Sequence, residues 1–499
     1  MKKIIKTFLA VLVILAIALN YSIVFAEPPE KPSGEMSSQN GGTPPDKPGE
    51  NGGAPGGNSG SSNVSHTGAT EISSDITNSG ALYSSTTGSQ NALLVAGGTS
   101  TITNPTITKS GDADGDNSDF YGTNAAVLVK EGTLNIDGGT VTTNGSHANG
   151  VFAYSNGKIN ISNTNIKTTS NNSGALMVTG GGTLTANNVS AETDGNSSAP
   201  IRSDRGGGTL TVNGGTYTAN GIGSPAIYST ADIIVNNATL TSTKSEGAVV
   251  EGKNSITLNN VNLIDTNTSL NGNSETYKNI FLYQSMSGDA DEGTASFTAK
   301  DSKLTTNKGD TIFITNIKAT ISLTNNKITN NDSTGGFLRI QSGKWGNSGS
   351  NGGDVTLNTN NQAIEGNIFV DNISTLAMKL TGESTYTGTI NGGNTAKSLS
   401  VSLDSSSTLT LAGDSYITAL NNEVSDNSNI NLNGHTLYVN GTAITSTNYK
   451  GTDTINSATN DNTQSNNNQT TIFVLSTVGV IVMVLGFIVF LMKKSNYQG

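Results

Sequence analysis

The stretch GGTLTVNGGTYT, residues 207–218, contains the pattern that decides the fold. Two apolar residues two positions apart, Leu210 and Val212, are followed five positions later by Tyr217, across an Asn-Gly turn. The pattern returns roughly every 25 residues, with occasional long insertions, and such a period is the signature of a solenoid. Further copies are Leu134/Ile136/Val141, Ile159/Ile161/Ile166, Leu184/Ala186/Ala191, Ile233/Val235/Leu240, Ile256/Leu258/Leu263, Phe297/Ala299/Leu304, Ile321/Leu323/Ile328, Leu409/Leu411/Tyr416 and Ile430/Leu432/Leu437.

Each copy follows a further short apolar run, such as residues 226–228. Three short strands per coil, separated by Gly and Asn turns, predict an all-β, right-handed parallel β-helix over residues 64–452, with about twelve coils. Side chains alternate across a strand, so Leu210 and Val212 point inward and the threonines between them point outward. Because an open solenoid must cover its end, we expect an atypical N-terminal cap with irregular strands. Around residues 345–400 we expect a looser register, since Thr385 stands at an apolar position.

The turns inside the repeat are rich in Asn-Gly and Asn-Asn pairs, such as Asn213-Gly214 and Asn236-Asn237. Asn and Gly enter the left-handed backbone region at the lowest cost, which a sharp corner between strands requires. We therefore interpret these residues as structural.

The composition excludes several classes of site. Only 33% of the 499 residues are hydrophobic, 13% are charged, the formal net charge is -11 and there is no Cys. The lack of Cys excludes disulfides and thiolate metal sites. An acidic chain with few Arg argues against nucleic acid as a partner, because phosphate binding depends on clustered Lys and Arg.

The two ends of the chain predict a surface protein. Residues 1–26 have a basic start, an apolar run and a small-residue exit, typical of a signal peptide cleaved after Ala26, with an uncleaved anchor as the alternative. Residues 27–63 are a disordered Pro/Gly-rich linker and residues 453–470 a polar linker. Residues 471–492 are long and apolar enough for a transmembrane helix, and Lys493 and Lys494 place the tail, 493–499, in the cytoplasm. We expect a single-pass cell-membrane protein with an extracellular β-helix.

The coil pattern, the signal peptide, the linkers and the C-terminal anchor together resemble right-handed parallel β-helices of the pectate-lyase-like class. The similarity is to the adhesin-like and carbohydrate-binding surface proteins of Gram-positive bacteria, and it covers about residues 90–445. This resemblance implies a fold and leaves the activity open, because the same fold hosts lyases, hydrolases, adhesins and passive stalks.

An acidic loop interrupts the repeat at residues 111–122, GDADGDNSDFYG. It offers Asp112, Asp114, Asp116 and Asp119 as hard oxygen ligands at the alternate spacing of Ca2+ loops. Other positions of such a loop are not matched and no flanking helices are predicted, so a solvated acidic loop is the alternative. A weaker echo, GDADEG at residues 288–293, contains Asp289, Asp291 and Glu292.

Catalysis would require positioned acids, bases or nucleophiles. Similar pectate lyases use acidic Ca2+ ligands with an Arg base, and the candidates here are Arg202, Asp204 and Arg205. These residues could equally form an exposed ion pair. They lie about three coils, or roughly 15 Å, from the acidic loop at the strand spacing. A hydrolase would require a His grouped with acids, whereas the His residues are scattered in the sequence, at His66, His147 and His435.

Trp345, the sole Trp, is the candidate for sugar binding. It lies in the insertion GKWGNSGSNGG near Arg339. The alternative is a ring folded over the coil edge. External Thr ladders also suggest an ice-binding face, but Lys158 and Asn160 interrupt them. Packing within or on the solenoid is expected for Tyr154, Tyr228, Phe281 and Tyr283.

These observations predict a non-catalytic protein that adheres to, or binds, a polysaccharide or a host or matrix surface, with Ca2+ as a possible cofactor. A polysaccharide lyase and a passive stalk are the alternatives. The sequence also directs attention to the places where the repeat is interrupted, at residues 111–122, 201–205, 288–293 and 343–353.

Overall fold

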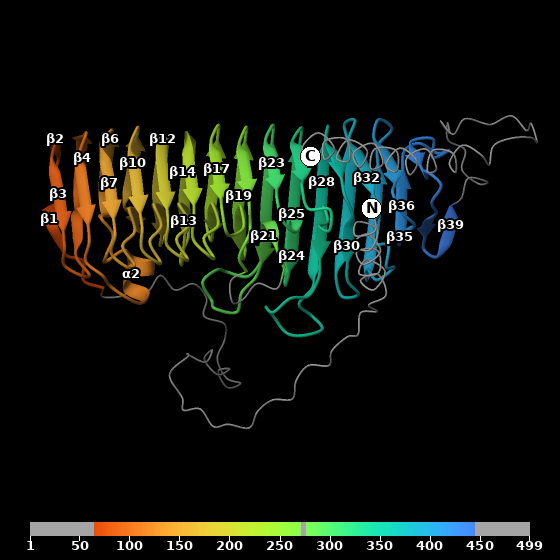
Figure 1. Ribbon diagram of the computed structural model, residues 1–499, viewed down its shortest axis with the longest axis horizontal. Coiled ribbons are helices and arrows are strands. Elements are labelled where there is room, and N and C mark those ends of the chain that lie inside the picture. Colours follow the sequence, from red (N-terminus) through yellow and green to blue (C-terminus); the bar gives the residue numbers. More distant parts are fainter. Residues whose placement is uncertain (1–63, 271–275, 445–499) are drawn as a thin grey trace, which may run out of the picture. The chain divides into compact units, whose positions relative to one another are not determined.

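The computed structural model describes residues 64–270 and 276–444. These residues form an all-β, right-handed parallel solenoid with almost no helix (Figure 1). It has about 15 turns, so the prediction of about twelve was too low. The additional turns lie where the sequence pattern is incomplete. One of them is the first coil, whose strand β1 (Gly68–Ile72) already pairs in parallel with β4 (Asn91–Thr103).

Each coil contributes a strand to three faces, which we number from the strands in residues 208–229. The first face contains residues 209–213, the second residues 216–219 and the third residues 227–229. The first face consists of β2 (Ile76–Ser79), β4, β6 (Val127–Asp137), β9 (Lys158–Ser162), β12 (Gly182–Thr193), β14 (Gly208–Ala219), β16 (Asp232–Asn236), β19 (Ser255–Asn259), β22 (Thr294–Lys300), β25 (Ile317–Thr324), β28 (Gly353–Asn360), β31 (Thr375–Thr381), β33 (Ser398–Leu403) and β36 (Ala419–Asn422).

The strands of the second and third faces are shorter. The second face consists of β3 (Leu82–Ser85), β5 (Thr106–Lys109), β7 (Thr140–Thr143), β10 (Asn165–Thr168), parts of β12 and β14, β17 (Thr239–Ser242), β20 (Asn262–Asp265), β23 (Lys303–Thr306), β26 (Lys327–Asn330), β29 (Ala363–Glu365), β32 (Thr385–Gly388), β34 (Thr408–Leu411) and β37 (Ile430–Asn431). The third face consists of β1, parts of β4 and β6, β8 (Val151–Tyr154), β11 (Leu176–Thr179), β13 (Ile201–Ser203), β15 (Ile227–Ser229), β18 (Ala248–Glu251), β21 (Lys278–Tyr283), β24 (Asp310–Thr315), β27 (Leu338–Ile340), β30 (Ile368–Val370), β35 (Ser415–Ile417) and β38 (Leu437–Val439).

The core is the column of apolar side chains that the repeat predicts. Leu210, Val212 and Tyr217 are fully buried. Leu210 lies in register between Leu184 of the preceding coil and Ile233 of the next. Each buried apolar side chain of this kind contributes roughly 1.5–3 kcal/mol, and stacking gives each coil the same contacts.

The corners use left-handed backbone, as expected. Gly214 has φ 74° and Asn237, at the equivalent corner, has φ 56°. Asn side chains at the preceding position form a ladder along the solenoid. Asn259 donates to Asn236 at 2.9 Å and Asn236 donates to Asn213 at 2.9 Å. The ladder satisfies amide groups that stacking brings together, which supports a structural role.

The section around residues 345–400 is more regular than the sequence pattern predicted. Tyr386, not Thr385, occupies the buried position, and Thr385 is exposed. The turn before β32 is one residue longer than the turn in residues 213–216, since six positions separate the buried Leu380 from Tyr386 whereas five separate Val212 from Tyr217. The strands on either side pair in parallel without interruption, as β29 does with β32.

The C-terminal end of the stack turns back on itself. Strand β39 (Thr442–Ile444) pairs with β38 in the antiparallel direction. This hairpin ends the parallel stack within the described residues. None of the helices in residues 64–270 and 276–444 is long and apolar enough to cross a bilayer. The predicted signal peptide, both linkers, the membrane helix and the cytoplasmic tail lie outside the described residues.

Candidate functional site

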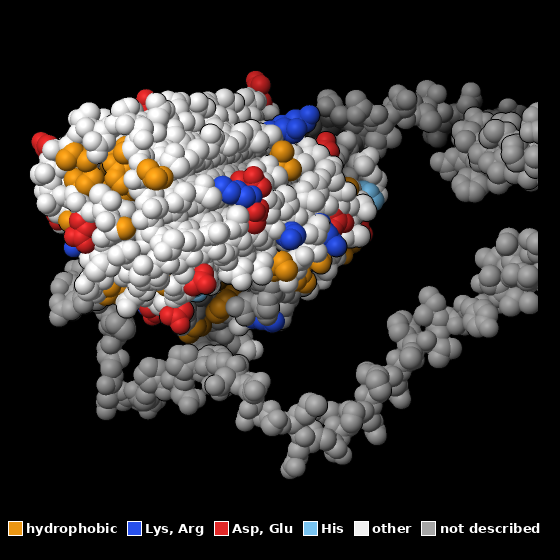
Figure 2. All heavy atoms as spheres, turned by 60° about the vertical axis from the view of Figure 1, so that its left-hand side comes forward, with side chains coloured by type: hydrophobic (Ala, Val, Ile, Leu, Met, Phe, Trp, Pro, Cys, Tyr) orange, Lys and Arg blue, Asp and Glu red, His pale blue; other side chains and the backbone are white. Residues whose placement is uncertain are grey.

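The outward-facing side chains of the third face differ from those of the other two. In the view of Figure 2, side chains that are neither charged nor hydrophobic, together with backbone, make up most of the surface. The third face instead has a register column of apolar, aromatic and Arg side chains. The column is Leu128, Phe152, Met177, Arg202, Tyr228, Val249, Phe281, Phe313, Arg339 and Phe369.

Three insertions leave the solenoid beside this column and project at the lower edge in Figure 1. The first contains the helix α2 (Asp116–Tyr121), the second is residues 284–293 after β21, and the third is residues 341–352 after β27. The sequence did not predict a helix in the acidic loop. At its end, Gly122 lies so close to Phe152 that an added Cβ would meet the ring at 2.9 Å. The helix therefore packs on the outer column.

Polar contacts fix this insertion to neighbouring coils. The Thr179 hydroxyl donates to the Phe120 carbonyl at 2.7 Å, and His66 Nε2 lies 2.9 Å from the Tyr121 carbonyl. The Arg205 guanidinium lies over the Phe120 ring, 4.0 Å from its centroid. These contacts fix α2 against the third face and so fix the positions of Asp119 and Phe120.

A cavity of about 240 Å³ opens between α2 and the second insertion, and we call it the first pocket. Its wall combines carboxylates, a guanidinium and aromatic rings from three parts of the chain distant in sequence. The lining residues are Asp119, Phe120, Ser197, Ala199, Arg202, Asp204, Gly223, Pro225, Tyr228 and Asp289.

Arg202 and Asp204 form a nearly buried ion pair in this pocket. Their side chains are 14% and 5% exposed, and Arg202 Nη2 lies 2.8 Å from Asp204 Oδ2. Arg202 Nη1 also donates to the Ser197 carbonyl at 2.9 Å, and the Arg205 amide donates to Asp204 Oδ1 at 3.0 Å. Burial raises the pKa of Asp204, while the positive charge of Arg202 opposes that rise. The alternative of a fully exposed ion pair is wrong for these two residues.

Arg205 connects the segment 201–205 to both acidic insertions, at residues 111–122 and 288–293. Its Nε donates to Asp289 Oδ1 at 2.5 Å, although the residues are 84 positions apart, and its Nη1 lies 3.5 Å from Asp116 Oδ2. The separation of roughly 15 Å that strand spacing predicts between the Arg pair and the acidic loop is therefore wrong. The insertion containing α2 and the long Arg205 side chain close that gap.

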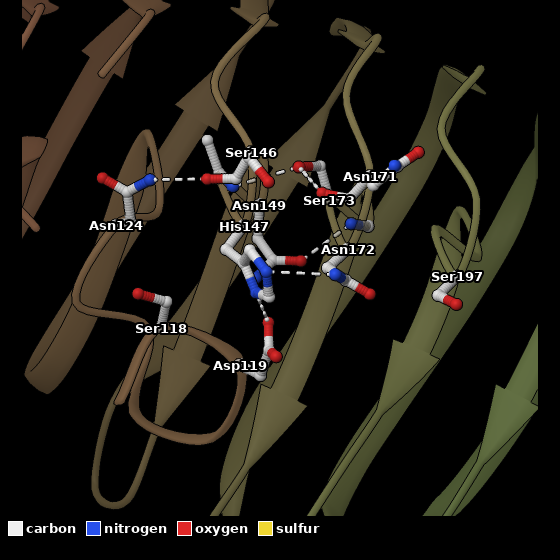
Figure 3. Close-up of polar contacts among 12 residues, drawn as sticks. Ser118, Asp119, Asn124, Ser146, His147, Asn149, Asn171, Asn172, Ser173 and Ser197 are labelled. Atoms are coloured by element: carbon white, nitrogen blue, oxygen red, sulfur yellow. Dashed lines mark hydrogen bonds and ion pairs between the residues drawn. The ribbon is translucent and has the colours of Figure 1, made fainter. Parts of the chain in front are cut away.

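His147 is a member of the site that sequence reasoning missed. Its Nδ1 lies 2.8 Å from Asp119 Oδ1, and Asn172 Nδ2 lies 3.0 Å from its Nε2 (Figure 3). In the tautomer with its proton on Nδ1, the ring donates to Asp119 and its Nε2 accepts from the Asn172 side-chain amide. His147 has φ 56° at a corner where the next coils have Asn172 and Ser197. The sequence did contain a signal for His147, because a His stands at a corner where the next two coils have Asn and Ser.

A buried carboxylate lies behind the pocket. Glu251 is 1% exposed and accepts hydrogen bonds from the hydroxyls of Tyr228, Tyr283 and Ser285. Burial, together with Tyr283 and Glu251, raises the pKa of Tyr228 well above its usual value. Glu251 holds the phenol ring of Tyr228 in place, so the aromatic wall of the pocket is fixed by a polar anchor. A Glu ending the apolar run of β18 was the sequence signal.

The four Asp residues of the predicted Ca2+ loop face different partners. Asp112 accepts from the Ser146 amide at 2.7 Å, Asp116 faces Arg205, Asp119 contacts His147 and Asp114 is exposed. Among the residues described, no three His or acidic side chains gather in a way that could hold a metal ion. Ca2+ binding by this loop stays a prediction. Calorimetric titration with Ca2+, repeated with Asp114→Ala, would test the prediction.

The three acidic residues of the second insertion have different surroundings. Asp289 lines the first pocket and pairs with Arg205, Asp291 lies 3.7 Å from Lys253 Nζ, and Glu292 lines a separate cavity. Of the acidic residues in the segment 288–293, only Asp289 thus lines the first pocket.

Trp345 and Arg339 have separate partners. The Trp345 ring is half-buried and its centroid lies 5.7 Å from that of Tyr283, so the ring is folded toward the coil. Arg339 pairs with Asp310, with Nε 2.6 Å from Oδ2, and covers the Phe369 ring at 4.2 Å. As predicted for the aromatic residues, Phe281 and Tyr283 stack on the outer column, with centroids 4.5 Å apart.

Comparison of the chain with protein-family models, with curated proteins and with solved structures gave no match to any of them. The coil architecture itself is consistent with the pectate-lyase-like β-helix that the repeat resembles. Functional inference therefore depends on the site.

Proposed function

We propose that the protein binds polysaccharide chains without cleaving them, through the first pocket, while displayed at the cell surface. The observation that carries the proposal is the convergence of three interruptions of the repeat on one concave site. Such a site, with a few fixed polar groups beside aromatic rings, is the usual form of a small-ligand pocket. Phe120 and Tyr228 offer ring surface to the apolar side of a sugar, and the carboxylates accept from its hydroxyls.

The charges of the pocket favour a glycan without acidic groups. The carboxyl groups of Asp119, Asp204 and Asp289 line the pocket with one guanidinium, that of Arg202, and a further pair, Arg205 and Asp116, lies beside it. Both guanidinium groups already pair with carboxylates, so neither is left to form the bidentate contact that a uronate would require. An acidic sugar would meet surplus negative charge, whereas a neutral sugar would meet hydrogen-bond acceptors.

Display at the surface rests on the predicted signal peptide, the two linkers and the C-terminal membrane helix. A binding domain joined to a membrane anchor through the two predicted linkers suits adhesion to a polysaccharide, host or matrix surface. Contact with several copies of a repeating glycan would raise the effective affinity of many anchored molecules together.

One observation favours an enzyme as the second candidate. Asp204 is a buried carboxyl with a raised pKa in a pocket that also contains Asp119 and Asp289, and a general acid requires such a group. A glycan array probed with the full-length protein, paired with assays for unsaturated and reducing products, separates the possibilities. Binding to neutral glycans without product supports the proposal. Product formation would replace it with an enzyme, and no binding and no product would favour a passive stalk.

A further inference from the structure

A second cavity, of about 270 Å³, lies between the second and third insertions, and we call it the second pocket. It shares the segment 284–293 with the first pocket. Its principal lining residues are Gln284, Met286, Glu292, Asn316, Asn347 and Ser350. Two interruptions of the repeat thus meet here, as three do at the first pocket.

An amide in this pocket has hydrogen-bonding capacity that the protein does not use. Gln284 is 8% exposed, and its Nε2 donates to the carbonyls of Ser285 and Ala290, each at 3.2 Å. Its Oε1 has no hydrogen-bond partner among the described residues. A buried acceptor without a donor costs about 1–3 kcal/mol, so a rotation of the Gln284 side chain that brought Oε1 to the cavity surface would let a ligand hydroxyl recover part of that free energy.

The third insertion also contains a buried amide with an unused acceptor, next to the lining residues of the second pocket. Asn351 is 4% exposed and uses its Nδ2 to hold the loop, donating to the Gly343 carbonyl at 2.8 Å and the Trp345 carbonyl at 2.9 Å. Its Oδ1 also has no partner among the described residues. Asn351 directly follows Ser350 of the pocket wall, so the loop is held firmly beside the cavity.

We infer that the second pocket is a further glycan subsite, which takes neutral, hydroxyl-rich sugar units of the same chain that occupies the first pocket. This inference rests on the proposed function and specifies its ligand as an extended oligosaccharide. Glu292 and Lys318 contribute one charge of each sign to the wall. Met286, 63% exposed, offers an apolar surface to a sugar ring. The chemistry therefore matches an uncharged sugar.

The segment 284–293 is the partition between the two pockets. Ser285 anchors it to the buried Glu251 behind the first pocket, and Asp289 anchors it to Arg205. Three strand spacings separate β15, which bears Tyr228, from β24, which precedes Asn316, or roughly 14 Å along the axis. A ligand that occupies both pockets must therefore be a chain of several sugar units that passes the partition.

The test uses calorimetric titration of the full-length protein with cello-, xylo- and manno-oligosaccharides from disaccharide to hexasaccharide. We expect the affinity to rise with length until the chain reaches both pockets. Asn347→Arg, which fills the second pocket from an exposed loop position, should lower the affinity of the longest sugars about tenfold. The same variant should leave the affinity of the shortest sugars within about twofold, because they occupy the first pocket alone.

Ser348→Arg is the matched control, since Ser348 lies in the same exposed loop and does not line the second pocket. If Asn347→Arg lowers the unfolding temperature, Asn347→Ala replaces it, with an expected loss of a few-fold for the longest sugars. Affinities of Asn347→Arg equal to wild type at every length would overturn the second subsite and leave the proposed function standing. If none of the three neutral series binds, the proposed function fails and the second subsite fails with it.

Discussion

Nδ1 of His147 lies 2.8 Å from Oδ1 of Asp119, and this contact joins a corner of the solenoid to the insertion that contains α2. The contact places Asp119 in the wall of the first pocket. A corner residue of the scaffold thus positions a residue of the proposed site.

His147→Asn should therefore separate binding from folding. Asn occupies the same corner in the next coil, as Asn172 with φ 54°, so the left-handed backbone is retained. We expect an unfolding free energy within about 1 kcal/mol of wild type and a several-fold loss of glycan affinity, measured by thermal unfolding and calorimetry. A variant that bound glycan as wild type does would show that the Asp119 contact has no role in the pocket.

The Arg202–Asp204 pair should show strong coupling. Arg202→Met leaves the buried Asp204 carboxylate without its partner, which should cost about 3–5 kcal/mol. The double variant with Asp204→Asn should recover most of that loss, because no buried charge remains. Denaturant unfolding of the two single variants and the double variant measures the coupling. Additive losses would contradict a tightly paired buried site.

Asp265 should make stability fall as pH rises. This side chain is fully buried on β20, and burial, with a further contribution from Glu246, raises its pKa from 3.8 to about 8. The folded protein therefore binds a proton that the unfolded chain releases between these values. The resulting stability is fully present below pH 3.8 and is lost as the pH rises to about 8.

Asp265→Asn removes this titration and keeps an oxygen for the Asn267 amide, which donates to Oδ1 at 2.8 Å. Relative to wild type, the variant should gain up to about 1.4 kcal/mol for each pH unit crossed in that window. Thermal unfolding across the window measures the difference. Parallel curves for the two proteins would exclude Asp265 as the source.

The repeat at residues 207–218 should contribute to stability and not to glycan binding. Leu210→Ala removes a fully buried side chain from the stacked core and should cost about 2–5 kcal/mol. Thr211→Ala, on the outside of the same strand, should change stability by no more than about 0.5 kcal/mol and leave glycan binding intact. A loss of binding in Thr211→Ala at unchanged stability would instead place function on the Thr ladder.

The repeated pattern predicted the fold because most coils place the same side chains in the same environment. The late copies Leu409/Leu411/Tyr416 and Ile430/Leu432/Leu437 were assigned to the wrong faces, since Leu409 and Ile430 lie on the second face and Tyr416 and Leu437 on the third. Leu210, Val212 and Tyr217 are buried as their spacing requires. The pattern failed at Thr385 because a turn gained one residue, which moved Tyr386 into the core. An apolar pattern with fixed spacing cannot detect such a change in turn length.

The candidate site was harder to predict because contacts between insertions do not follow the coil period. Arg202, Asp204, Arg205 and Asp289 were all identified as unusual in the sequence. Their convergence depends on how far α2 and the segment 284–293 reach along the third face, which the spacing of strands does not contain. Glu251 was missed because it ends an ordinary apolar strand.

The most direct test of the account is calorimetric titration of full-length wild type, Tyr228→Ala and Thr211→Ala with the neutral oligosaccharide that binds wild type most tightly. Tyr228 lines the first pocket, whereas Thr211 faces outward from the first face. We predict that Tyr228→Ala loses at least about tenfold in affinity while Thr211→Ala binds as wild type does. Equal affinities for the three proteins, with all three folded, would contradict the assignment of glycan binding to the first pocket.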